Sequence, residues 1–255
     1  MRLIFITIAL LCSLISIAQK DSVKAKVYGW NDILVDKDSN SYRMQFVNGP
    51  TKSLANLEIH LTELDPGKSL LPHSYSDAEQ LVVVKEGILK VTIKGKPTPI
   101  GPGGVALVTP GDDVSFENTG KVLATYYVLK FRSGGATNPD RAKVAGGSFI
   151  GDWENWPVQE NDKGERREVF DRFTNLFSKM ELHVTTLNGG QVAHNPHKHP
   201  QEEILLVRKG NGQVLIGDGI SPIVPGDVVF FASGVLHSIK NTSSAPLEYF
   251  ALQWQ

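Results

Sequence analysis

Two stretches of the sequence, GPGGVALVTPGDDVSFENTG (101–120) and VPGDVVFFASGVLHSIKNTS (224–243), match each other. In each, apolar residues run between glycine-containing turns. The similarity extends outward in the same order: LEIHLTELDPG (57–67) matches MELHVTTLNGG (180–190), VVVKEGILKVTI (82–93) matches LLVRKGNGQVLI (205–216), and YYVLKF (126–131) matches YFALQW (249–254). Because the offset stays near 123 residues throughout, the sequence predicts a duplicated domain.

Within each copy, short segments rich in valine, isoleucine, leucine and phenylalanine alternate with turns of glycine, proline, asparagine and aspartate. This pattern is typical of a small antiparallel barrel or sandwich, so we expect an all-β fold of two tandem barrels. We place the first barrel at 19–131 and the second at 170–255. Residues 132–169 form a linker and covering segment, in which the tryptophans at 153 and 156 have a packing role.

The first 18 residues predict a cleaved secretory signal peptide. One arginine precedes an apolar run from Leu3 to Ile17, with small Ser16 and Ala18 before polar Gln19. The run falls short of the roughly 20 apolar residues that span a bilayer, so we expect no stable membrane anchor. Cys12, the only cysteine, lies in this segment, and the mature protein would have no disulfide or thiolate site. We therefore expect a secreted or periplasmic protein.

The chain carries 26 basic and 27 acidic residues, with no long run of one sign. Nothing in this balance favours a polyanion-binding surface, so we expect no nucleic-acid partner.

Three histidines lie within six positions in HNPHKHPQEE (194–203). Residues two apart on a strand point to the same side, so a strand here would project His197 and His199 together. After a turn at Pro200, Glu203 can begin the next strand beside them, and His237 is available from a later strand. Three neutral imidazoles and one carboxylate suit a divalent first-row metal.

The second copy resembles the cupin family. It contains H-x-H-x3-E-x6-G as His197, His199, Glu203 and Gly210, and G-x7-G-x2-H-x3-N ending in His237 and Asn241. Two departures are visible: one extra residue separates Gly190 from His197, and Ala232 replaces a proline. The resemblance implies two jelly-roll-like barrels, a bicupin, with His197, His199, Glu203 and His237 as the metal ligands. It leaves the metal open among manganese, iron, nickel, copper and zinc.

The first copy lacks most of this set. His73 aligns with His197, but Tyr75, Gln80 and Ser115 stand opposite His199, Glu203 and His237. Glu79 precedes Gln80 by one position and could supply the missing carboxylate ligand if the alignment were shifted by one residue. Because a phenol with a pKa near 10 is a poor ligand at neutral pH, we expect a metal-free first barrel. The first barrel is therefore expected to have a structural role. It could form a homodimer contact or shape the mouth of the second barrel.

Six further polar residues are candidates for a role in the site. His60 and His183 occupy the same repeat position, and their presence in both copies favours a role in the fold. His194 is interpreted as a loop residue at the rim. Strand alternation places Arg208 and Glu202 on the face opposite Glu203. For Gln253, at the position of Lys130, a surface location is favoured over a pocket contact.

The leading functional hypothesis is a metal-dependent enzyme acting on a small oxygenated organic molecule, by dioxygenase-like or Lewis-acid chemistry. A non-catalytic protein that binds a sugar acid or phenolic is the alternative from a different class. Ureidoglycine aminohydrolase is an analogy in layout, although its ligand pattern differs. Oxalate-decarboxylating bicupins are a further comparison, but these typically carry metal in both barrels.

Overall fold

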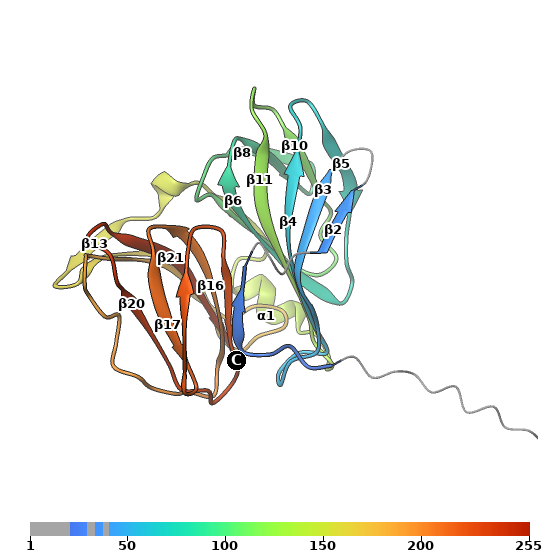
Figure 1. The fold of residues 1–255 in the computed structure, drawn as a ribbon. Helices are drawn as coiled ribbons and strands as arrows, with labels where there is room; N and C mark the ends of the chain where they lie inside the picture. Colours follow the sequence, from blue (N-terminus) through green and yellow to red (C-terminus); the bar gives the residue numbers. More distant parts are fainter. Residues whose placement is uncertain (1–20, 30–33, 38–40) are drawn as a thin grey trace, which may run out of the picture.

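The computed structural model describes residues 21–29, 34–37 and 41–255 (Figure 1). The predicted signal peptide and its cleavage point lie outside these residues. Within them, no helix has the length and apolar character needed to cross a membrane. Two β-barrels lie side by side, which confirms the predicted all-β class and tandem arrangement.

The first barrel is built from a seven-stranded sheet, ordered β12-β9-β6-β11-β4-β3-β2, and a four-stranded sheet, ordered β5-β10-β7-β8. Its own strands are β2 (Leu34–Lys37), β3 (Tyr42–Gly49), β4 (Asn56–Leu64), β5 (Ser69–His73), β6 (Ala78–Glu86), β7 (Leu89–Ile93), β8 (Lys96–Ile100), β9 (Val105–Val108), β10 (Val114–Asn118) and β11 (Ala124–Arg132).

The second barrel repeats this plan with a seven-stranded sheet, ordered β1-β19-β16-β21-β15-β14-β13, and a three-stranded sheet, ordered β18-β17-β20. Its own strands are β13 (Val158–Asn161), β14 (Gly164–Arg172), β15 (Met180–Leu187), β16 (Glu202–Lys209), β17 (Gly212–Ile216), β18 (Gly219–Ile223), β19 (Val228–Phe231), β20 (His237–Asn241) and β21 (Leu247–Trp254).

Each large sheet ends in a strand from outside its own repeat. Strand β1 (Lys26–Tyr28) pairs with β19 of the second barrel, and its blue ribbon lies against that barrel in Figure 1. Strand β12 (Phe149–Gly151), from the connecting segment, pairs with β9 of the first barrel. The connection also holds helix α1 (Pro139–Val144) and the 3₁₀ turn η2 (Trp153–Asn155). The sequence boundaries at 131 and 169 do not anticipate this exchange.

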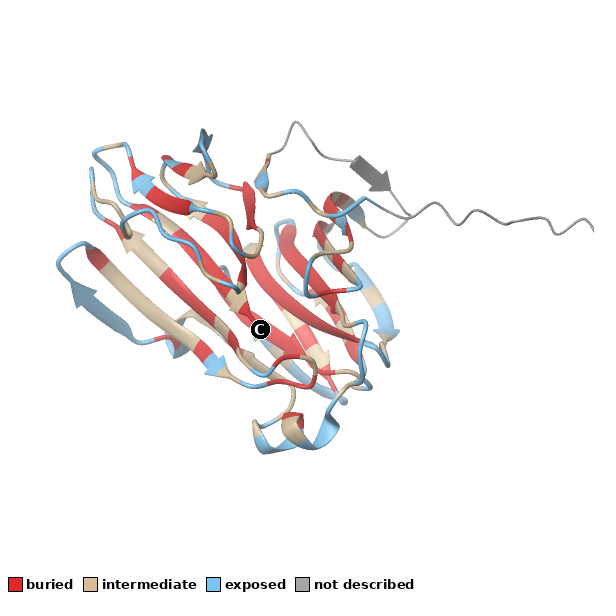
Figure 2. Cartoon of the chain, turned by 90° about the horizontal axis from the view of Figure 1, so that it is seen from below, coloured by how far each residue is buried: buried red, intermediate tan, exposed pale blue. Residues whose placement is uncertain are grey.

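The central strands of the large sheets are buried on both faces, as their red colour illustrates (Figure 2). On β16, Leu205 and Val207 belong to the interior cluster of the second barrel. The alternate residues Ile204 and Leu206 belong to a cluster that also contains Leu81 of the first barrel. The two large sheets therefore pack face to face, and this contact forms the principal core of the molecule.

Two motif residues serve the fold in both copies. Gly87 and Gly210 adopt φ of 76° and 75°, and a Cβ at either would lie within 2.5 Å of a backbone oxygen of the neighbouring strand segment. Only glycine fits such turns. Asn118 donates to the carbonyls of Leu64 and Val122, and Asn241 makes the same two bonds in the second barrel. These positions are thus explained by folding rather than by chemistry.

The tryptophans of the connecting segment pack as predicted. Trp156 is buried, and Trp153 packs against the core between the barrels. Trp153 lies between two guanidinium groups, those of Arg167 and Arg208, at 4.3 and 4.1 Å from its ring centre. Cation–π contacts of this kind hold the connecting segment against β14 and β16.

Candidate metal centre

His197 and His199 reach the site from a loop and not from a strand. The predicted strand across them is wrong: the chain makes only a single antiparallel bridge, in which His197 and His237 exchange backbone hydrogen bonds of 3.1 and 2.9 Å. The carbonyl of His199 accepts from Gly234 N at 2.8 Å. The segment 194–201 is therefore tied to the turn before β20, which brings three imidazoles together from two segments.

Glu203 lies at the start of β16, as predicted, and is 4% exposed. Its Oε2 is 3.4 Å from Nε2 of His199 and 3.5 Å from Nε2 of His237. His237, 1% exposed, stacks on Phe231 with 4.4 Å between ring centres. The carboxylate and the two imidazoles thus converge at the wall of the second barrel.

Backbone carbonyls fix the orientation of these imidazoles. Nδ1 of His199 lies 3.1 Å from the carbonyl of Gln201, and Nδ1 of His237 lies 2.9 Å from the carbonyl of Val235. A carbonyl only accepts, so the Nδ1 atoms carry the protons and the Nε2 atoms present lone pairs. Both Nε2 atoms are buried without a hydrogen-bond partner. Lone pairs that converge on a carboxylate repel it unless a proton or a metal ion lies between them, so these residues fit a metal that replaces the protons.

The charge state of Glu203 suits the same purpose. Burial acts to raise the pKa of its carboxyl, but contacts with His199 and then His237 outweigh burial and hold the pKa at about 2. The carboxylate in turn raises the pKa of His199. Burial, followed by the neighbouring imidazoles, lowers the pKa of His197. The site therefore offers one ionised carboxylate to a cation.

His194 belongs to the cluster, which the sequence reasoning missed. Two groups of residues place their ligand atoms within 4.8 Å of one another: His199, Glu203 and His237, and His194, His197 and His237. The rings of His194 and His197 are 4.1 Å apart. The spacing His194-x2-His197 was the available signal, but it lies outside the cupin motif. His237 is common to both groups.

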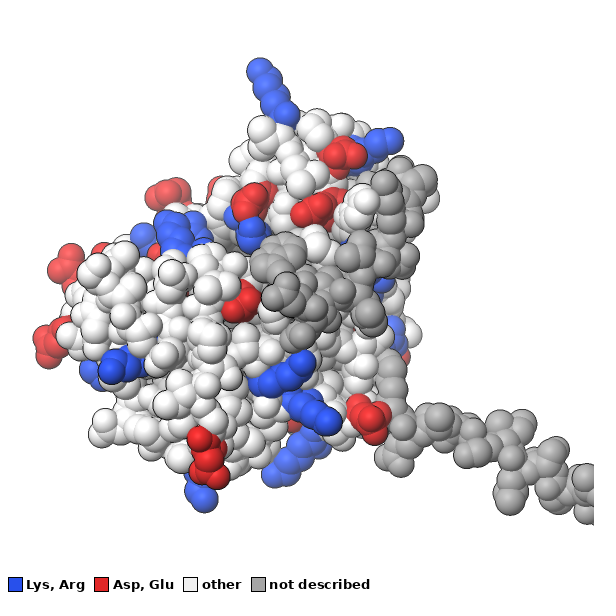
Figure 3. Space-filling view, viewed as in Figure 1, with Lys and Arg blue, Asp and Glu red and all other residues white. Residues whose placement is uncertain are grey.

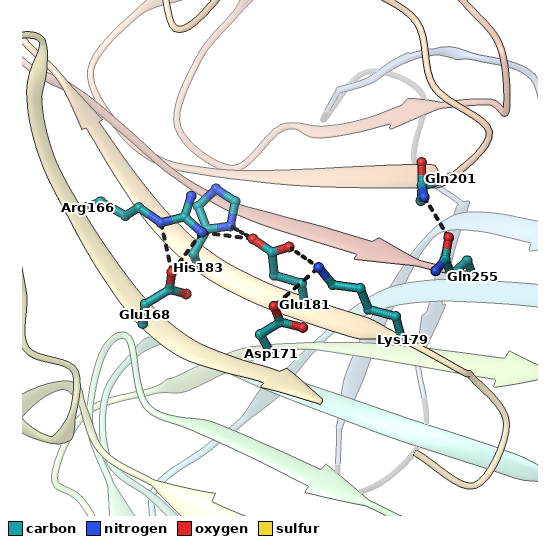
Figure 4. A network of polar contacts seen from close by, with 8 residues as sticks. All are labelled: Arg166, Glu168, Asp171, Lys179, Glu181, His183, Gln201 and Gln255. Carbon is teal, nitrogen blue, oxygen red and sulfur yellow. Dashed lines mark hydrogen bonds and ion pairs between the residues drawn. The ribbon is translucent and has the colours of Figure 1, made fainter. Parts of the chain in front are cut away.

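A cavity of about 310 Å³ opens beside these residues. Arg166, Glu181 and His183 form part of its wall: Arg166 binds Glu181 at 2.8 Å, and His183 Nδ1 lies 3.2 Å from the same carboxylate (Figure 4). Contact with His183 lowers the pKa of Glu181 to about 2, against the effect of burial. Gln253 also lines the cavity, so the surface position favoured from sequence is wrong.

Arg208 and Glu202 lie away from the cavity, on the face predicted by strand alternation. Arg208 pairs with Glu248 and stacks on Trp153. Glu202 is buried between the barrels, where it accepts hydrogen bonds from Thr51 Oγ1 and from Lys52 N. Neither lines the cavity or points freely to solvent.

In the first barrel the equivalent residues do not form such a cluster. The residue at the place of His237 is Val114 and not Ser115, so that prediction is wrong: Val114 pairs with His73 as His237 pairs with His197, and Ser115 matches Ser238. His73, Tyr75 and Gln80 line a cavity of about 320 Å³, and Lys130 Nζ lies 4.8 Å from the centre of the Tyr75 ring. Across residues 21–29, 34–37 and 41–255, the groups with converging metal-ligand atoms are confined to the second barrel. Glu79 does not supply the missing ligand, because its carboxylate faces the opposite side of β6 and binds the loop at Thr174.

Comparison with known families decides the classification. The sequence matches the cupin domain family twice, over residues 60–130 and 183–252. The chain belongs to the cupin family. The two matches make it a bicupin, which confirms the resemblance seen in the motifs, and His60 and His183 each stand at the start of a matched region.

Solved structures share this bicupin fold across most of their length. AerE from Microcystis aeruginosa is 15% identical, with a TM-score of 0.69 and coverage of 88% of this chain and 97% of that one. Lactobacillus farciminis oxalate decarboxylase is 13% identical, with a TM-score of 0.71 and coverage of 93% and 88%. Bacillus subtilis oxalate decarboxylase, which has Mn(II) centres, is 14% identical, with a TM-score of 0.65 and coverage of 92% and 78%. No curated protein sequence matches this chain.

Proposed function

We propose that the second barrel binds one divalent first-row transition metal through His197, His199, Glu203 and His237. The observation that carries the proposal is the pair of buried Nε2 atoms, on His199 and His237, that face the Glu203 carboxylate without a hydrogen-bond partner. Imidazole and carboxylate ligands suit manganese, iron, nickel, copper and zinc. The Mn(II) centres of the Bacillus subtilis relative make manganese the first metal to test.

We further propose that the site is catalytic and acts on a small oxygenated organic molecule. Such a metal supplies either Lewis-acid polarisation of a bound oxygen or activation of dioxygen. A cavity of about 310 Å³ beside the ligands provides space for the substrate, and its wall carries Lys163 and Arg166 together with Glu165 and Glu181. An oxygen-rich substrate matches this polar wall and the metal ligands, as in the oxalate-acting relatives.

The trio Arg166, Glu181 and His183 has a separate role. The first barrel carries Arg43, Glu58 and His60 at the equivalent positions, with His60 Nδ1 3.1 Å from Glu58. His60 and His183 both line their cavities. Because the first barrel keeps the trio without the metal ligands, we assign it to the shape and polarity of the cavity rather than to chemistry at the metal.

Elemental analysis of the purified protein, followed by an oxygen-consumption and product screen with phenolics, keto acids and oxalate, tests the proposal. Glu203→Gln is nearly isosteric but removes the negative charge, so it should lose the metal and all turnover while the circular dichroism spectrum stays unchanged. Glu160→Gln, at an exposed position of β13, is the matched control.

Three results are informative. Turnover by Glu203→Gln without metal would refute the catalytic site. Saturable binding of a phenolic or sugar acid by a metal-loaded protein that turns over none of the compounds would favour the non-catalytic alternative. Retention of metal by Glu203→Gln at wild-type affinity would show that the ligand set is wrong.

A further inference from the structure

The cavity of the first barrel differs from that of the second in its charge. Its wall carries Arg43 and Lys130, and among the described residues that line it there is no aspartate or glutamate. The second cavity also has two cations on its wall, Lys163 and Arg166, but it is lined by Glu165, Glu181 and Glu203 as well. The two cavities are nearly equal in volume, at about 320 and 310 Å³. The first barrel has therefore kept its cavity while changing its electrostatics.

Lys130 occupies the position of Gln253 of the second barrel and brings a cation next to Gln80. It pairs with Gln80 across β11 and β6, as Gln253 pairs with Glu203 in the second barrel. Its side chain is only 8% exposed. An ammonium group thus lies beside the position that holds the carboxylate ligand in the second barrel, where it supplies positive charge without a metal.

Within the part of the chain whose side chains are described, the cations of the cavity have one carboxylate between them. Glu58 is their shared partner, with its Oε1 3.4 Å from Lys130 Nζ and 3.8 Å from Arg43. Among the side chains that the structure describes, two cationic groups therefore share one carboxylate. A buried ammonium with an incomplete partner favours an anionic ligand, because the charge is poorly compensated in a medium of low polarity.

Gln80 provides a second, independent observation. Its side chain is 2% exposed and lines the cavity, and its Oε1 is buried without a hydrogen-bond partner. Buried polar atoms are normally paired, so this amide calls for a polar group in the cavity. A ligand hydroxyl meets the need in either orientation of the amide, since it both donates and accepts.

We propose that the first barrel is a metal-independent binding site for small hydroxy acids, with the carboxylate held by Lys130 and Arg43 and the hydroxyl by Gln80. The site is separate from the proposed metal centre and does not depend on it. The exposed Leu71, which lines the same cavity, marks its opening to solvent.

Titration calorimetry of the full chain with glycolate, acetate and glycolamide tests this proposal. Measurements use the wild type and His237→Ala, both treated with chelator, so that metal in the second barrel contributes nothing. Glycolate should bind to both, acetate more weakly, and the neutral glycolamide least. Lys130→Gln introduces the residue found at the equivalent position of the second barrel and should weaken glycolate binding by about tenfold or more.

Lys121→Gln, at an exposed loop position, is the control and should leave glycolate binding unchanged. Gln80→Leu keeps both cations and should remove the preference for glycolate over acetate. If Lys130→Gln does not fold, Lys130→Arg, which keeps the charge, should retain binding. No saturable binding of glycolate, equal binding of glycolamide, or loss of binding in His237→Ala alone would each overturn the proposal.

Discussion

Glu79 and Glu202 occupy the same position in the two repeats, and each accepts hydrogen bonds from the opposite barrel. Glu79 binds Thr174 Oγ1 at 2.8 Å and Asn175 N at 2.7 Å, in the loop before β15. Glu202 binds Thr51 Oγ1 at 2.6 Å and Lys52 N at 3.0 Å, in the loop before β4. The two buried carboxylates thus join the barrels reciprocally.

Replacement of Glu79 by alanine should lower the free energy of unfolding by about 3 kcal/mol. The change leaves buried N–H and hydroxyl groups of the 174–176 loop without an acceptor, and hydrogen bonds to charged groups are among the stronger ones. Urea denaturation measures the effect, with the exposed Glu160→Ala as the control. A difference below about 0.5 kcal/mol between the two variants would show that this contact adds nothing to the interface.

The repeat comparison predicts one metal ion per chain. A ligand that binds only the folded state stabilises it by about 4 kcal/mol at a thousandfold excess over Kd, so chelation should lower the melting temperature. His237→Ala should abolish both the bound metal and the effect of chelator. His73→Ala, at the only ligand position that the first barrel retains, should change neither. Two ions per chain, or loss of the ion in His73→Ala, would contradict the assignment of a single metal site to the second barrel.

His60 should make folding sensitive to acid. Burial lowers its pKa to about 4, even though the neighbouring Glu58 carboxylate acts in the opposite direction. Between pH 6.5 and about 4, the unfolded chain therefore binds a proton that the folded chain does not. The free energy of unfolding consequently decreases as the pH is lowered through this range. The contribution approaches about 1.4 kcal/mol per pH unit in that window.

Urea denaturation of wild type and His60→Gln across this range measures the effect as a difference between the two proteins. The variant should show a shallower dependence on pH, whereas other histidines contribute equally to both. Parallel curves would mean that the imidazole of His60 is protonated in the folded protein.

Export remains a prediction from the N-terminal sequence. We propose that cleavage after Ala18 yields a mature chain that begins at Gln19, because Ser16 and Ala18 follow a short apolar run. N-terminal sequencing of the protein from the culture medium or periplasm is the direct measurement. An intact Met1 on a membrane-bound product would contradict it.

The sequence by itself determined the two-barrel architecture and the asymmetry between the copies. These depend on local patterns: the repeat offset, alternating apolar residues, turn glycines, and the replacement of three ligand residues by Tyr75, Gln80 and Val114. Strand alternation also placed Arg208 opposite Glu203, because side chains on a strand alternate with a strict period of two.

Only the tertiary structure decided which side of each strand meets the cavity and which meets the other barrel. Strand β6 is buried on both faces, so its residues do not alternate between apolar and polar. The sequence therefore could not show that Glu79 faces the interface between the barrels. Nor could it show that Lys130, which pairs with Gln80, faces the cavity. Strand β1 pairs with β19, which is far away in the sequence, so no local pattern predicts this contact. His194 lies in a loop, where side chains follow no regular alternation, so its place in the cluster could not be predicted either. Such contacts follow from the packing of one sheet on another, which no local pattern encodes.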